Sequence, residues 1–97
     1  MKLPGPRSYP KELHIAEETW QVRLVKKIPD EGADTVGRTD FPDRIIWIKR
    51  DQTKQQLFRT FIHEVIHCIE FEHNLDIKHR DVYTLEKALV DTLMMNI

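Results

Sequence analysis

Residues 53–73 read TKQQLFRTFIHEVIHCIEFEH, and the arrangement of the whole chain can be predicted outward from this stretch. Its apolar side chains recur at helical spacing over a wide surface, which predicts a helix packed on more than one side. Thr53 followed three residues later by Gln56 is a capping-box pattern that marks the start of a helix. We therefore expect a central helix from about Lys54 to His73.

The predicted helix carries His63, Glu64 and His67 in the pattern H-E-x-x-H. Residues four apart on a helix lie about 40° apart around the axis and about 6 Å along it, so the two imidazoles project side by side. Two adjacent nitrogens are half of a zinc site, and the carboxylate between them can accept a proton from a metal-bound water. The pattern predicts Zn²⁺ bound by His63 and His67, with Glu64 as the catalytic base. The alternative is a helix with two ordinary surface histidines.

Composition excludes several other classes of function. The 97 residues make one domain near the lower size limit for an adequate core, so a bound metal can also add to folding stability. Lys and Arg number 15 against 16 Asp and Glu, and this balance gives no general argument for binding nucleic acid or an anionic membrane. The single Cys68 excludes an internal disulfide framework and is expected to be a small buried residue. No signal-like run or long apolar stretch is present, so a cytoplasmic protein is expected.

The part of the chain ahead of the helix has the pattern of a small sheet. Residues 1–11 are rich in proline and predict an extended lead-in, followed by a single domain over residues 12–97. Three short strands are expected, at residues 19–28, 35–39 and 44–49, and residues 12–15 are a further short extended candidate. The strand at 44–49 is almost entirely apolar, so we expect it to be covered on both faces.

A second helix is expected over residues 81–96, where apolar residues recur at positions 82, 85, 89 and 93. Glu86 lies about 40° from Val82 around the helix, inside the stripe meant for burial. A buried carboxylate is costly unless it is paired, protonated or bound to a metal, and the predicted zinc site needs a third ligand. Glu86 is therefore the predicted third ligand. The expected fold class is α+β, a twisted sheet of about three strands followed by the metal-binding helix and a C-terminal helix.

Two histidines remain alternatives for the third ligand. His73 stands ten residues after His63, which is the metzincin spacing, but Glu70 replaces the glycine at which that helix turns back. Without such a turn His73 lies about 15 Å along the axis from His63, too far to share an ion. His79 lies on the same face as Glu86 but about 10 Å from it along the axis, where it could stabilise an oxyanion or start the helix.

The order of short strands, a helix with His63, Glu64 and His67, and a second helix with Glu86 resembles the zincin metallopeptidases. The specific resemblance is to the minimal gluzincins and to the small metallopeptidases common in phages and prophages. It implies zinc-dependent hydrolysis of a peptide or protein substrate, bound extended and antiparallel to an edge strand of the sheet. Residues 37–41 or the strand from residue 44 would line that cleft.

Other acidic and aromatic side chains are candidates for supporting roles. Tyr83, one turn before Glu86, is a candidate oxyanion donor, and its alternative role is an ordinary residue at the rim of a packed helix. Glu70 and Glu72 are candidates for hydrogen bonds that orient the histidine ligands, and the alternative for both is a solvated carboxylate.

Two rival functions remain open from the sequence. In the first, the zinc is structural, closed by a fourth ligand such as His79 or Cys68, and the domain binds a regulatory or host protein without catalysis. In the second, the chain is a DNA-associated protease similar to the SprT-like DNA-repair proteases, with His73 as the third ligand. That function needs a basic face, for which the clustered candidates are residues 26, 27, 44, 49 and 50. Charged strands usually face water, so nucleic acid is not expected as a partner.

Overall fold

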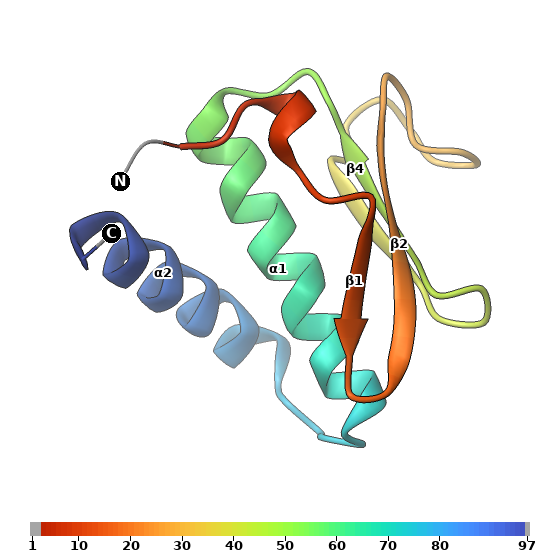
Figure 1. Cartoon of the computed structure of the whole chain (residues 1–97), viewed down its shortest axis with the longest axis vertical. Helices are drawn as coiled ribbons and strands as arrows, with labels where there is room; N and C mark the ends of the chain where they lie inside the picture. Colours follow the sequence, from red (N-terminus) through yellow and green to blue (C-terminus); the bar gives the residue numbers. More distant parts are fainter. Residues whose placement is uncertain (1–2, 97) are drawn as a thin grey trace.

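The computed structural model describes residues 3–96. In this range a four-stranded sheet, α1 and α2 form three layers, with α1 between the sheet and α2 (Figure 1). The strands are β1 (Glu12–Ile15), β2 (Glu18–Val25), β3 (Gly37–Asp40) and β4 (Ile45–Lys49). The helices are α1 (Lys54–Glu72), α2 (His79–Asn96) and a short 3₁₀ helix, η1 (Pro6–Ser8). The predicted α+β class is confirmed. The extended candidate at residues 12–15 forms β1, a strand in addition to the three that were expected.

The sheet has the order β1-β2-β4-β3, which places β3 at one edge. β1 and β2 pair antiparallel, β2 and β4 pair parallel, and β3 pairs antiparallel with β4. Because β3 has a neighbour on one side only, alternate backbone groups along it remain free to bind another chain. This free edge borders the residues of the H-E-x-x-H pattern.

The ends of α1 follow the local signals in the sequence. The Thr53 side chain accepts a hydrogen bond of 3.2 Å from the backbone N–H of Gln56, which satisfies one of the free donors of the first turn. At the other end Asn74 adopts a left-handed conformation with φ of 53°, and the N–H of Leu75 bonds back to the Glu70 carbonyl. The predicted start at Lys54 is confirmed, and the helix ends one residue before His73.

The core lies between the sheet and α1. Trp20, Ile46, Ile48, Leu57 and Cys68 are all fully buried there. The expectation that β4 is covered on both faces is wrong, because Ile45 and Trp47 on its other face are only half-buried. Both helices lie on the same side of the sheet, so alternate residues of β4 receive full cover from one side only (Figure 1).

The buried stripe of α2 also differs from the prediction. Val82, Glu86 and Val90 are buried, whereas Leu85 and Leu89 are 42% and 43% exposed. The contact with α1 therefore follows a spacing of four residues centred on the carboxylate. The prediction that Glu86 faces the interior is confirmed, and the prediction that the leucines at 85 and 89 share that face is wrong.

A buried carboxylate fastens the last turn of α1 to the sheet. Glu72 accepts hydrogen bonds from Trp20 Nε1 at 3.0 Å and from Arg44 Nε at 2.9 Å, and its side chain is 5% exposed. The hydrogen bond from Arg44 is the main cause that lowers the pKa of Glu72 below its ordinary 4.5. Glu72 therefore orients neither histidine, contrary to one role considered for it.

In the described part of the chain, no helix has both the length and the apolar character needed to cross a bilayer.

The lowered pKa of Glu72 predicts the pH dependence of stability. Its carboxylate contributes stability above its unfolded-state pKa, and this contribution is lost as the pH falls through the lower pKa of the folded state. We expect the Glu72→Gln variant to unfold at a lower temperature at pH 7 and to lose less further stability between pH 5 and pH 3 than wild type. Thermal unfolding followed by circular dichroism measures both effects. Glu17→Gln, on an exposed turn, is the matched control, and equal acid slopes for Glu72→Gln and wild type would contradict the assignment.

Candidate metal centre

The two histidines of the H-E-x-x-H pattern converge at one point. The Nε2 atoms of His63 and His67 are 3.2 Å apart, and the two side chains are 14% and 21% exposed. Two nitrogen ligands of a tetrahedral zinc ion, each about 2.0–2.1 Å from the metal, are separated by about 3.3 Å. The spacing of this pair therefore fits one zinc ion between them.

A carboxylate lies behind each ring, at the nitrogen turned away from the other histidine. Nδ1 of His63 is 2.9 Å from Glu86 Oε1, and Nδ1 of His67 is 3.2 Å from Glu70 Oε1. These acceptors favour the tautomer with hydrogen on Nδ1, so that both Nε2 atoms carry lone pairs. Two facing lone pairs repel each other unless a proton or a metal ion lies between them. This arrangement is chemical support for a cation site, and Glu70 has the orienting role considered for it.

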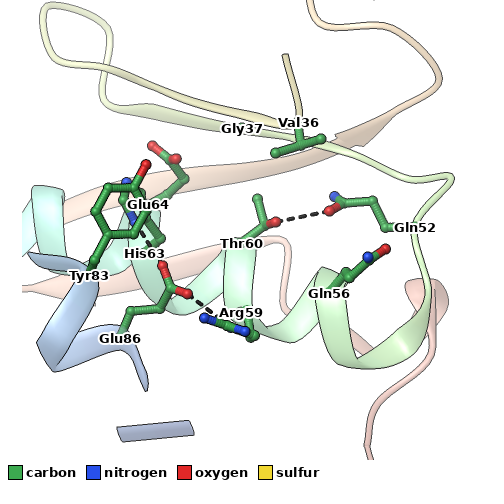
Figure 2. Close-up of a pocket in the computed structure, with 10 residues that line it drawn as sticks. All are labelled: Val36, Gly37, Gln52, Gln56, Arg59, Thr60, His63, Glu64, Tyr83 and Glu86. Carbon is green, nitrogen blue, oxygen red and sulfur yellow. Dashed lines mark hydrogen bonds and ion pairs between the residues drawn. The ribbon is translucent and has the colours of Figure 1, made fainter. Parts of the chain in front are cut away.

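Glu86 reaches His63 but not the space between the two Nε2 atoms. Oε1 is bonded to His63 Nδ1, and Oε2 accepts a hydrogen bond of 3.0 Å from Arg59 Nε. Figure 2 shows the carboxylate between these two partners. The residue is 6% exposed. Each oxygen of this buried carboxylate is therefore already paired with a protein group. Nothing in the sequence marks Arg59 as its partner.

The start of α2 brings two further rings to the histidines. The ring centroid of His79 is 5.6 Å from that of His63 and 5.7 Å from that of His67. Tyr83 lies 5.0 Å from His63 and 4.9 Å from His79, and it is 54% exposed. His79 and Glu86 are about 10 Å apart along the axis of α2, yet α1 and α2 pack so that both residues meet His63.

Two other candidate ligands lie outside this group. His73 caps the C-terminal end of α1, and among the described residues it makes no ring contact with the other histidines. Cys68 is fully buried in the core, and burial raises the pKa of its thiol to about 12. Its prediction as a small buried residue is confirmed. Within residues 3–96, no three His, Cys, Asp or Glu side chains are already grouped as a metal site.

Glu64 is held against the edge strand. It is 7% exposed, and its Oε1 accepts a hydrogen bond of 2.7 Å from the Thr39 hydroxyl. A Cβ atom added to Gly37 would lie 2.8 Å from Glu64 Oε2, so the backbone of β3 passes directly over the carboxylate. Sequence reasoning did not single out Thr39. The available signal was strand alternation, which puts residues 37 and 39 on one face.

The formal charges around the histidines favour a cation. Glu64, Glu70 and Glu86 contribute three negative charges, and Arg59 contributes one positive charge, which leaves an excess of two negative charges if the histidines are neutral. At such short range in a partly buried site, this excess attracts a divalent ion.

A groove runs along β3 with the histidines at its middle. A cavity of about 300 Å³ is lined on one side by Gly37, Thr39 and Phe41 and on the other by the rings of His63, His67 and His79 with Glu64. A cavity of about 460 Å³ adjoins it, with the polar side chains of Arg59, Gln52 and Gln56 in its wall (Figure 2). On the other side, a cavity of about 470 Å³ includes the apolar side chains of Phe41, Phe71 and Leu75. Adjoining cavities share lining residues, so together they outline one groove.

The chain was compared with models of protein families, with curated proteins and with solved structures, and none of them matches it.

Proposed function

We propose that this protein is a zinc-dependent metallopeptidase in which His63 and His67 bind the ion and Glu64 is the catalytic base. The observation that carries the proposal is the pair of Nε2 atoms 3.2 Å apart, each on a ring whose Nδ1 faces a carboxylate. When bound, zinc supplies a Lewis acid that polarises a carbonyl and brings the pKa of a water to about 7. From the sequence, Glu86 is the expected third ligand.

Glu64 is proposed to move the proton in this reaction. Thr39 donates to Oε1 and fixes the rotation of the carboxylate, which leaves Oε2 to take a proton from the attacking water. The same oxygen then passes the proton to the leaving amine, so one group serves first as base and then as acid. Glu64 is only 7% exposed beside the two histidines, which limits its contact with bulk water.

Tyr83 is proposed to donate a hydrogen bond to the oxygen that becomes negatively charged as the peptide carbonyl is attacked. Its ring lies beside His63 and lines the cavity of about 460 Å³ in the groove (Figure 2). Preorganised donors of this kind act on charge that develops in the transition state.

The proposed substrate is an extended peptide segment bound antiparallel to β3. The support is the edge position of β3 together with the groove between this strand and the histidines. An extended peptide can add to a free sheet edge through backbone hydrogen bonds, which places its carbonyl groups along the groove.

One observation favours a second candidate function, a zinc-stabilised binding protein. Leu85 and Leu89 form an exposed apolar stripe on α2, and such stripes occur at contacts with protein partners. The DNA-associated alternative has less support, because His73 lies apart from the other histidines and Arg44 is paired with Glu72.

Glu64→Gln separates catalysis from binding. We expect this variant to bind one zinc per chain, as wild type does, and to cleave an unstructured protein such as casein about 10²–10⁴-fold more slowly, since it has lost its base. Elemental analysis and gel-based cleavage assays measure the two properties, with Glu17→Gln as the exposed control. Cleavage by Glu64→Gln at the wild-type rate would refute the proposed mechanism. Zinc binding without cleavage by any form would support the binding protein instead.

Gly37→Ala tests the close approach of β3 to Glu64. The new methyl group would stand 2.8 Å from both Glu64 Oε2 and Thr60 Cγ2, so the carboxylate must shift. We expect a loss of about 1–3 kcal/mol in the free energy of unfolding and a fall in kcat/KM with zinc retained. Gly32→Ala is the matched control because a Cβ there would meet nothing within 4 Å. Equal urea unfolding curves and activities for the two variants would contradict this geometry.

A further inference from the structure

We propose that His79, and not Glu86, is the third protein ligand of the metal, and that Glu86 is a positioning residue that holds His63. This inference rests on the proposed zinc site but not on peptide hydrolysis. It replaces the ligand expected from the sequence with one from the first turn of α2.

The three histidine rings have the spacing of ligands to a single ion. An imidazole bound through one nitrogen has its centroid about 3.2 Å from zinc, so three such rings on a tetrahedral ion have centroids about 5 Å apart. The three centroid distances among His63, His67 and His79 are 4.8, 5.6 and 5.7 Å. All three rings also line the same cavity next to Glu64.

Glu86 contacts the nitrogen of His63 that does not face His67. The two nitrogens of an imidazole point in widely different directions, and Glu86 is bonded to Nδ1 of His63 while Nε2 faces His67. A metal on Nε2 is therefore far outside the roughly 2 Å of a zinc–oxygen bond from this carboxylate. A carboxylate that accepts the free N–H of a histidine ligand fixes the tautomer and the ring orientation instead.

The burial of Glu86 needs no metal to explain it. A buried carboxylate is tolerated when hydrogen bonds and an opposite charge compensate for lost hydration. Arg59 supplies the charge at 3.0 Å, and the N–H of His63 supplies a second hydrogen bond at 2.9 Å. The feature that pointed to Glu86 as a ligand is therefore satisfied by contacts to protein groups.

The connection between the helices delivers His79 to the site. Glu70 bonds His67 through Oε1 and accepts the backbone N–H of Ile77 through Oε2 at 2.9 Å. One carboxylate thus orients a metal-binding ring and tethers the segment that leads into His79 two residues later. No three ligands are preassembled within the described residues, so metal binding requires the exposed His79 ring to turn toward the two Nε2 atoms.

Metal titration of the full chain tests the assignment without using activity. Zinc affinity is measured by competition with a chelator for wild type, His79→Ala, Glu86→Gln and the control His73→Ala. We expect His79→Ala to lose more than 100-fold in affinity and Glu86→Gln to lose about 10–100-fold, the range for a group that orients a ligand. His73→Ala should bind like wild type. Far-UV circular dichroism of each metal-free variant reports whether it is folded.

Substitution with Co²⁺ counts the histidine ligands directly. Each histidine bound through Nε2 gives one exchangeable, paramagnetically shifted N–H proton signal. We expect three such signals in wild type and in Glu86→Gln, where the one from His63 moves, and two in His79→Ala. Wild-type affinity and an unchanged signal count in His79→Ala would overturn the proposal, as would loss of zinc by folded Glu86→Gln alone. If wild type binds no zinc, the metallopeptidase proposal fails as well; if it binds zinc without cleaving, only that proposal fails.

Discussion

The facing Nε2 atoms of His63 and His67, with a carboxylate behind each ring, link the candidate metal centre to the packing of α2 on α1. The carboxylate behind His63 is Glu86 of α2, and the one behind His67 is Glu70, three residues after His67 on α1. Glu86 buries a charge between the helices only because His63 and Arg59 satisfy it. The packing of α2 on α1 and the geometry of the centre are thus one set of interactions, and a substitution that disturbs either affects both.

The sheet supplies the rigidity that this pair of rings requires. At the C-terminal end of α1, Glu72 accepts a hydrogen bond from Trp20 of β2 and another from Arg44, which directly precedes β4. Near its middle, Glu64 is bonded to Thr39 of β3. The helix is therefore held against the sheet at two points, with His67 between them and His63 directly before the first. Binding sites carried by such fixed elements are more precise than sites on loops.

What the sequence predicts well is local. The start of α1 follows from Thr53 and Gln56, and the side-by-side projection of His63 and His67 follows from helical geometry alone. What it predicts poorly depends on contacts between distant segments. The exposed positions of Leu85 and Leu89 could not be deduced from periodicity, because the burial of Glu86 is compensated by residues of another helix. Which nitrogen of His63 meets Glu86, and the approach of Thr39 to Glu64, are likewise tertiary facts.

The shortness of β3 has a consequence for what kind of chain can occupy the groove. Its four residues, Gly37–Asp40, offer a partner strand at most about four backbone hydrogen bonds, each with a net contribution of about 1 kcal/mol. That total corresponds to a dissociation constant of roughly 1 mM. A segment inside a folded protein would have to unravel locally before pairing with β3, and this edge supplies too little energy to drive the unravelling. For the proposed peptide substrate, we therefore expect the groove to accept segments that are already unfolded rather than segments inside a folded protein.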